Sequence, residues 1–253
     1  MSENRLQRPL VLAGVALVSA MIGGGVVAGL DSTRPPAAAG EAIRAYLLSH
    51  PEVLPEAMER LQAREAEKAE RAQAQAQQSV PQHVEALGRP YAGAWAGNPK
   101  GDVTVVAFMD YACGYCRASL PGLDKLIASD PNVRVVYREY PVLGPDSVMA
   151  ARWALAAAEQ DRYRAFHDAL YAAGSPSTAT IAAAAQKAGL DLRRAEASVR
   201  SQAVAAEINQ NHGLGEKLAM TGTPSWVIGG HLYYGARDYA ALAAAVAQAR
   251  AQR

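Results

Sequence analysis

The hydrophobic pattern begins with a long apolar run near the N-terminus. Residues 9–30 carry no charged side chain and follow two arginines. A helix of that length could cross a bilayer of about 30 Å, with the basic flank left in the cytoplasm. The small residues at 35–40 would also suit cleavage by a signal peptidase. We therefore expect residues 1–30 to be a signal peptide or a signal anchor, followed by a linker over 31–40 and an exported remainder.

Helical periodicity follows this linker and predicts a helical segment over residues 41–80. Pro51 and Pro55 interrupt the backbone hydrogen bonds, so a second helix should begin near Pro55. The apolar positions of residues 41–61 form one patch that is too small to bury itself, which favours oligomerisation through this segment. The alternative is a solvated spacer, which the Gln/Ala-rich stretch at 62–78 favours.

Residues 81–97 are rich in Gly and Pro and predict an irregular linker. The compact domain is expected over 98–253. Its first part has β-branched strand patterns at 102–110 and 132–140, with a helical pattern at 114–129 between them. A strand, a helix and a strand in this order predict a parallel pair with a right-handed crossover.

In the rest of the domain, the sequence pattern predicts helices and a β-hairpin. A helical insertion is expected over about 146–220, followed by two strands joined by a double-glycine turn within 224–235. Asp238 is a suitable N-cap for a last helix. Trp226 and Phe108 fall in apolar strand positions and are expected in the core. The fold class is therefore mixed α/β.

Charge patterning limits the choice of partners. The chain has 25 basic and 24 acidic residues and a formal net charge of +1. No basic stripe suits a phosphate backbone, so nucleic acid is not an expected partner.

The only two cysteines, Cys113 and Cys116, stand three residues apart. Cys113 follows a predicted strand and begins a predicted helix, where free backbone N–H groups and the helix dipole favour a thiolate. Cys116 lies about one helical turn further on, close enough to attack a mixed disulfide formed at Cys113. The pair can therefore cycle between a dithiol and a disulfide.

Other uses of the cysteine pair fit the sequence less well. A structural zinc site needs a second cysteine pair or two histidines three to five residues apart, and the chain has neither. Haem attachment needs a histidine where Arg117 stands. A purely structural disulfide, which export would favour, would close a very small loop and stabilise the fold least. We predict redox chemistry with no metal site and no cofactor.

Two motifs carry a resemblance to a known family. VVAFMDYACGYC and, about a hundred residues later, TGTPSWVIGG resemble the thioredoxin fold in its DsbA-like branch, which has helices inserted after the first strand–helix–strand unit. The stretch IRAYLLSHPEVLPEAMERL resembles the N-terminal segment of ScsC-like exported thiol oxidoreductases, which oligomerises in that group. The resemblance implies a thioredoxin fold with a helical insertion, behind an N-terminal helical segment.

The resemblance also implies a substrate-binding set beside the catalytic Cys113 and Cys116. Pro224 would be a cis-proline facing the cysteines, and the backbone of Thr223 would dock an extended substrate chain. Gly114 and Tyr115, between the cysteines, resemble the pair found in DsbC-type isomerases. They lack the imidazolium of the Cys-Pro-His-Cys motif in strongly oxidising DsbA proteins, so a milder oxidant is expected.

Asp110 and Glu139 stand at the ends of the two predicted strands. They could relay protons to Cys116. Solvated polar side chains at strand ends are the simpler interpretation, and we expect that of both.

The predicted function is an exported thiol:disulfide oxidoreductase that isomerises, oxidises or reduces disulfides in envelope proteins. Its expected partners are cysteine-containing substrates, a membrane thiol reductase or oxidase, and further copies of itself. Its expected location is the periplasm, either anchored to the inner membrane by residues 9–30 or free after cleavage. The alternatives are a monomeric DsbA-type thiol oxidase and a tethered chaperone or copper-binding module that holds Cu(I) on the two thiolates.

Overall fold

The computed structural model of the chain describes residues 37–252, and these divide into two compact units at Glu67 and Lys68. The predicted signal or anchor segment, 1–30, lies outside the described residues. Within the described part of the chain, no helix is both long enough and apolar enough to cross a membrane.

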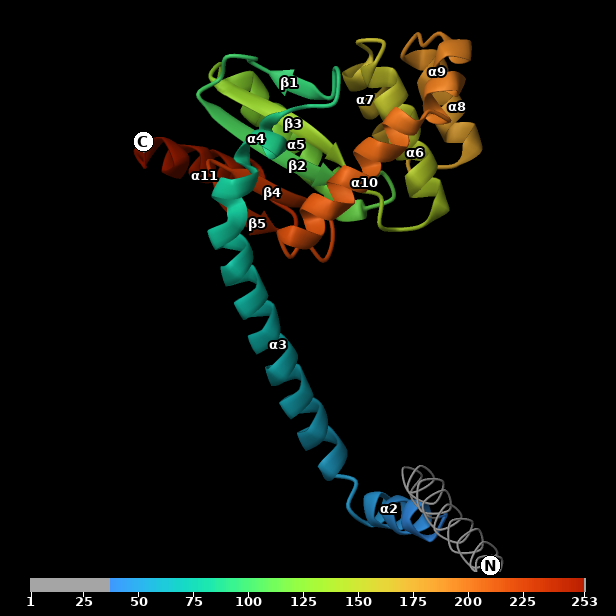
Figure 1. Cartoon of the computed structure of the whole chain (residues 1–253), viewed down its shortest axis with the longest axis vertical. Helices are drawn as coiled ribbons and strands as arrows, with labels where there is room; N and C mark the ends of the chain where they lie inside the picture. Colours follow the sequence, from blue (N-terminus) through green and yellow to red (C-terminus); the bar gives the residue numbers. More distant parts are fainter. Residues whose placement is uncertain (1–36, 253) are drawn as a thin grey trace, which may run out of the picture. The chain divides into compact units, whose positions relative to one another are not determined.

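The first unit contains α2 (Ala37–Ser49) and the beginning of α3 (Val53–Ser79), coloured blue in Figure 1. The helices are separated where the prolines predicted a break, and the amide of Leu54 donates to the carbonyl of Pro51 in that turn. Helix α2 begins within the stretch expected to be a linker. Most large apolar side chains of this unit are exposed in the single chain, and Leu47 and Val53 are half-buried. The exposed ones are Ile43, Tyr46, Leu48, Leu54, Met58 and Leu61.

The second unit is built on a five-stranded sheet with the order β1-β3-β2-β4-β5. Strands β2 (Val103–Met109) and β3 (Val133–Glu139) run parallel, joined by α5 (Gly114–Ser129) as the predicted crossover. Strands β4 (Ser225–Ile228) and β5 (His231–Tyr234) form the predicted hairpin, and β4 lies antiparallel to β2. The mixed α/β fold class is therefore confirmed.

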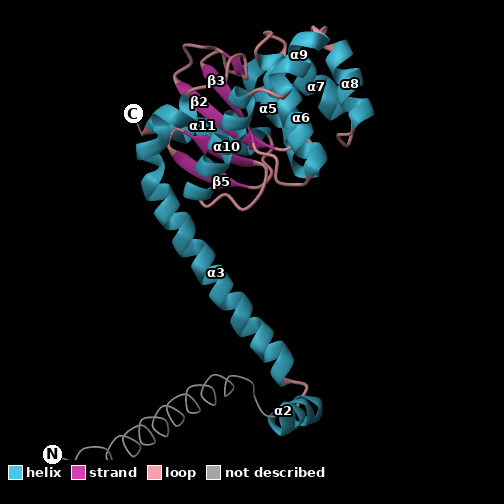
Figure 2. Cartoon of the chain, turned by 45° about the vertical axis from the view of Figure 1, so that its right-hand side comes forward, coloured by secondary structure: helices cyan, strands magenta, loops and turns pink. Residues whose placement is uncertain are grey.

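Helices cover both faces of this sheet (Figure 2). One face packs on α5 and on α11 (Tyr239–Ala251), with Trp226 fully buried in that core. The other face packs on the 3₁₀ turn η1 (Val80–His83), on α4 (Val84–Gly88) and on α10 (Gln202–Lys217), with Phe108 fully buried. Successive strand residues point to opposite faces, so the near-continuous apolar run of β2 supplies both cores.

The predicted helical insertion is confirmed. It consists of α6 (Pro145–Ala158), α7 (Tyr163–Ala173), α8 (Thr178–Lys187), α9 (Leu192–Val199) and α10. Polar side chains cap three of these helices and Asp238 caps α11 as predicted, because each accepts a hydrogen bond from an otherwise unpaired backbone amide.

The predicted linker at 81–97 is wrong in part, because it contains α4 and the edge strand β1 (Trp95–Gly97), which pairs antiparallel with β3. Strand β1 has only three residues, two of them small, so its sequence shows no alternation of apolar and polar side chains from which a strand could be predicted. The spacer interpretation of 62–78 also fails at its end: the side chain of Gln77 donates to the carbonyl of Gly230 and accepts from the amide of Leu232. The second unit therefore begins at residue 68 rather than 98.

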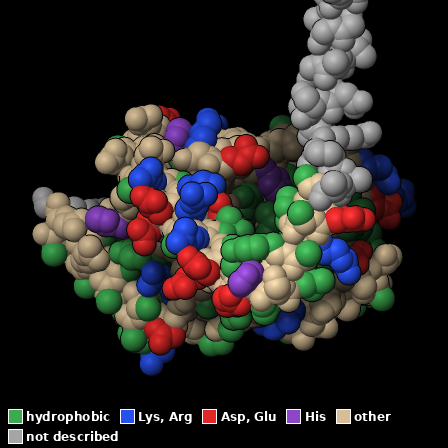
Figure 3. All heavy atoms as spheres, turned by 90° about the horizontal axis from the view of Figure 1, so that it is seen from below, with side chains coloured by type: hydrophobic (Ala, Val, Ile, Leu, Met, Phe, Trp, Pro, Cys, Tyr) green, Lys and Arg blue, Asp and Glu red, His purple; other side chains and the backbone are tan. Residues whose placement is uncertain are grey.

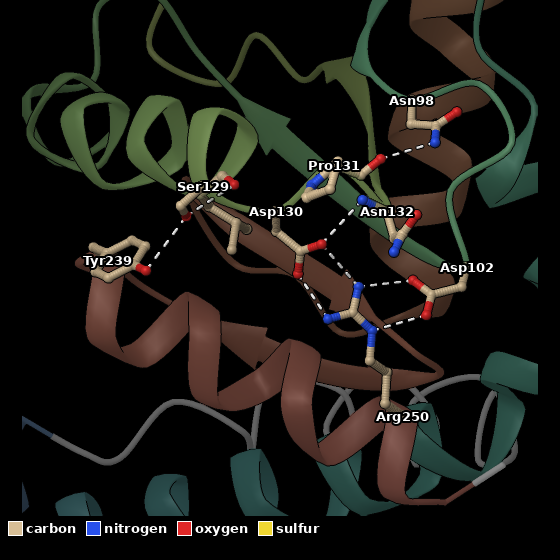
Figure 4. Close-up of polar contacts among 9 residues, drawn as sticks. Asn98, Asp102, Ser129, Asp130, Pro131, Asn132, Tyr239 and Arg250 are labelled. Atoms are coloured by element: carbon tan, nitrogen blue, oxygen red, sulfur yellow. Dashed lines mark hydrogen bonds and ion pairs between the residues drawn. The ribbon is translucent and has the colours of Figure 1, made fainter.

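Arg250, near the end of α11, ties three elements of this unit together (Figure 4). Its guanidinium bonds Asp102 just before β2, with Nε to Oδ2 at 2.8 Å, and Asp130 just after α5, with Nη1 to Oδ2 at 2.7 Å. Elsewhere, basic and acidic side chains are intermixed on the face shown in Figure 3, which shows no large patch of one sign. This agrees with the near-neutral composition.

Candidate redox site

Cys113 occupies the N-cap position of α5, directly after the turn that leaves β2. Its sulfur takes the place of the usual capping oxygen, because the amide of Cys116 donates to Cys113 Sγ at 3.4 Å. The helix dipole adds a stabilisation of about 0.3–1 kcal/mol for a negative charge at such a position. The structure thus confirms the predicted strand–turn–helix setting of the motif.

The two thiols differ in accessibility. Both cysteines are free; Cys113 is 6% exposed, whereas Cys116 is 0% exposed. Burial raises the pKa of Cys116 well above its ordinary value, so this thiol keeps its proton at neutral pH. Both residues are buried, and of the two only Cys113 keeps any exposed surface. The geometry therefore suits an attacking Cys113 and a resolving Cys116.

The antiparallel pairing of β2 with β4 brings Thr223 and Pro224 to the cysteines. The Thr223–Pro224 peptide bond is cis, as the resemblance implied. The thiol of Cys113 donates a hydrogen bond to the carbonyl of Thr223, 3.1 Å away. Tyr115 is 72% exposed and nothing lies within 4 Å of the missing side chain of Gly114, so the turn between the cysteines is open to a partner.

Asp110 is not the solvated residue that its position at a strand end suggested. Its side chain is buried and accepts three backbone hydrogen bonds, from the amides of Ala112, Val142 and Leu143. The turn after β2 and the loop after β3 fold over it and exclude water. The expectation of a solvated side chain is therefore wrong.

Glu139 is buried as well, so the same expectation fails there. The hydroxyl of Tyr163 donates to Glu139 Oε1 at 2.7 Å, and the hydroxyl of Tyr111 lies 3.3 Å from the same oxygen. Burial raises the pKa of Glu139 to about 8. Glu139 reaches the cysteine segment through Tyr111, two residues before Cys113.

A buried aromatic cluster beside this carboxyl group was missed by the sequence reasoning. Tyr163, His167 and Tyr171 lie four residues apart on α7; the rings of His167 and Tyr171 pack against Tyr111, and the ring of Tyr163 packs against His167. Burial lowers the pKa of His167 to about 3, so its ring is neutral, with Nδ1 3.1 Å from the Tyr111 hydroxyl. The spacing of four was a readable signal for one buried helix face.

Among the described residues, the cysteine pair is the candidate for binding a metal ion. Across residues 37–252, no three His, Cys, Asp or Glu side chains converge on a point that could hold an ion. The two sulfurs of Cys113 and Cys116 are soft donors that could hold Cu(I) without a third ligand.

Comparisons with known proteins match both parts of the chain. A family model described as a DSBA-like thioredoxin domain matches residues 104–247, and the model of the copper resistance protein ScsC N-terminal domain matches residues 37–68. A thioredoxin-like oxidoreductase from Silicibacter pomeroyi is 42% identical, with a TM-score of 0.62, over 65% of this chain and 95% of that one. ScsC of Proteus mirabilis in a transitional conformation is 28% identical, with a TM-score of 0.63, over 87% of this chain and 100% of that one.

A curated relative resembles the chain in only a part of its own length. The Na(+)/H(+) antiporter NhaA 3 of Salinispora tropica is 32% identical over 156 residues, which is 60% of this chain and 24% of the antiporter. The chain thus spans about a quarter of that relative.

Proposed function

The chain belongs to the family of DSBA-like thioredoxin domains, which are thiol–disulfide oxidoreductases, and from that premise we propose that it isomerises disulfide bonds in exported proteins. The observation that carries the proposal is the unequal cysteine pair: Cys113, which caps a helix N-terminus and keeps 6% exposure, and Cys116, which is fully buried one turn further on.

The proposed chemistry is thiol–disulfide exchange. The Cys113 thiolate attacks one sulfur of a substrate disulfide, forms a mixed disulfide and displaces the other substrate sulfur as a thiolate. The displaced thiolate can attack another disulfide of the substrate, which releases a new substrate thiolate. When a substrate thiolate then attacks the mixed disulfide, Cys113 is freed, so the substrate's disulfides are rearranged with no net transfer of electrons. Alternatively Cys116 loses its proton and attacks Cys113, which leaves a Cys113–Cys116 disulfide and a substrate reduced by two electrons.

Isomerisation requires that the pair be at least partly reduced. Gly114 and Tyr115 supply no cation between the cysteines, so the Cys113 thiolate gains no imidazolium partner there. A less stabilised thiolate makes a weaker oxidant, and about 30 mV of potential corresponds to 1.4 kcal/mol. A membrane thiol reductase is the proposed partner that keeps the pair reduced.

Polypeptide substrates fit the surface beside Cys113. Tyr115, Val142, Leu143 and Met149 are large apolar side chains that are all exposed. Tyr115 lies between the cysteines, and the amides of Val142 and Leu143 bond Asp110, three residues before Cys113. Exposed apolar side chains suit the apolar segments that unfolded or misfolded chains present. Thr223 and Pro224 would hold the backbone of such a segment, as the resemblance implies.

Residues 41–61 are proposed to bring several active sites together. The exposed apolar side chains of α2 and of the first turns of α3 have no cover in the single chain, and copies of the same segment would bury them. The match of residues 37–68 to the ScsC N-terminal model supports this assignment.

Export to the periplasm is part of the proposal. It rests on the uncharged apolar run at residues 9–30, behind two arginines, which lies outside the described residues. The domain would then work at the membrane surface if that run is retained as an anchor, or free in the periplasm if it is cleaved.

The test is recovery of activity from a scrambled-disulfide substrate. Full-length protein should restore the substrate, and the Cys113→Ala variant should not. Leu54→Ser tests the oligomer and should lower recovery while leaving oxidation of a reduced substrate in place. Rapid oxidation without recovery would instead indicate the DsbA-type oxidase, and tight Cu(I) retention with no exchange would indicate the copper-binding module.

A further inference from the structure

Asp110 joins the cysteine turn to a second loop through its carboxylate. Oδ1 accepts from the amide of Ala112 at 2.8 Å, and Oδ2 accepts from the amides of Val142 at 2.8 Å and Leu143 at 3.0 Å. The side chain is 1% exposed. Three donors converging on one buried carboxylate fix its position, since each would be costly to leave unpaired.

The backbone of Asp110 holds the nucleophile from the other side. Its carbonyl accepts from the amide of Cys113 at 3.0 Å and from the hydroxyl of Tyr171 at 3.0 Å. One residue therefore sets the place of Cys113 and, through its side chain, the place of the loop after β3.

That loop carries apolar side chains to the surface. Val142 is 41% exposed and Leu143 is 55% exposed, although their amides point inward to Asp110. The first helix after the loop adds Met149, which is 44% exposed. A polypeptide that contacts these side chains is held at a fixed distance from the Cys113 sulfur for as long as Asp110 keeps both connections.

We propose that Asp110 is a positioning residue that couples an apolar docking loop, residues 142–143, to the nucleophile Cys113. The ligand is an extended polypeptide segment with apolar side chains next to its disulfide. This inference rests on the proposed function and deepens it. Asp110 does not touch the substrate; it sets where a segment bound at Leu143 presents its sulfur.

The coupling predicts a loss that depends on the size of the substrate. In an Asp110→Asn variant one oxygen becomes an amide NH₂ that faces backbone donors, so one of the two connections is broken. A displacement of about 1 Å between a bound substrate and its reacting group can cost about a hundredfold in rate. Glutathione disulfide has no large apolar side chain to bind at the loop, so the displacement should lower its rate of exchange much less than that of the peptide.

The experiment measures kcat/KM for oxidised glutathione and for a peptide disulfide flanked by Leu and Val, using the full chain. The ratio of peptide to glutathione values should fall at least tenfold in Asp110→Asn and at least fivefold in Leu143→Ser. Leu192→Ser, an apolar residue of similar exposure (40%) on α9, is the matched control and should keep the wild-type ratio. In the double variant the two losses should not add, because both act through one loop.

Several results would overturn the proposal. Equal losses for both substrates in Asp110→Asn would mean that the residue acts on the sulfur alone. An unchanged ratio in Leu143→Ser would mean that the loop does not dock substrate, and this result would overturn the proposal even if Asp110→Asn does not fold. Failure of the wild-type protein to exchange either disulfide would refute the proposed function itself. This result differs from the two above, in which the wild-type protein is active and only the variants contradict the proposal.

Discussion

Replacing Glu139 by Gln should remove a large part of the pH dependence of stability. The carboxyl group is buried against Tyr163 and Tyr111, and burial raises its pKa from 4.5 to about 8. Glutamine keeps an oxygen that can accept from the tyrosine hydroxyl, fills nearly the same volume and carries no charge at any pH. The variant therefore isolates the cost of ionising this one group.

The sign follows from proton binding in the folded and unfolded states. Below pH 4.5 both states hold the proton; between pH 4.5 and about 8 only the folded state holds it, so the free energy of unfolding falls as the pH rises. Above about pH 8 both states have released it. A tenfold change in proton affinity corresponds to about 1.36 kcal/mol, so the whole interval contributes roughly 5 kcal/mol as an order of magnitude.

The assay is urea unfolding of wild type and Glu139→Gln between pH 5 and pH 9, followed by far-UV circular dichroism. Other titrating groups contribute alike to both proteins, so the difference between the two curves isolates Glu139. Wild type should lose several kcal/mol relative to the variant over this interval. The exposed Glu196, replaced by Gln, is the control and should give a curve parallel to wild type. Parallel curves for Glu139→Gln would refute the argument that this carboxyl group is held protonated by burial.

Three further predictions concern the thiols, the C-terminal helix and the N-terminal segment. Cys116→Ser should accumulate mixed disulfides with substrate on Cys113, visible as mass adducts that a reductant removes, because no resolving thiol remains; a chain that stays free of adducts would contradict the assignment. Arg250→Met should lower the free energy of unfolding in urea by about 1 kcal/mol, because Asp102 and Asp130 lose the cation that they share. Arg193→Met, at an exposed position of α9, is the control and should change it little. Leu54→Ser should reduce the molar mass in light scattering towards that of one chain, and an unchanged mass would exclude this apolar face from the interface.

Sequence patterns predicted best those features that depend on near neighbours. The placement of Cys113 at a helix N-terminus follows from the β-branched run before it and the helix formers after it. The cap at Asp238 and the proline break between α2 and α3 are equally local. The cis peptide at Thr223–Pro224 was expected only through the family resemblance, because X–Pro bonds are usually trans.

The sequence by itself determined the redox motif, the α/β order of elements and the helical insertion, because these depend on local periodicity and on spacing within one turn. Only the tertiary structure decided that Asp110 and Glu139 are buried, that Trp95–Gly97 forms an edge strand and that Gln77 packs against β5. Each of these depends on segments distant in the chain: a polar residue at a strand end is solvated or buried according to which loop folds over it, and three residues pair as a strand only when a partner strand lies beside them.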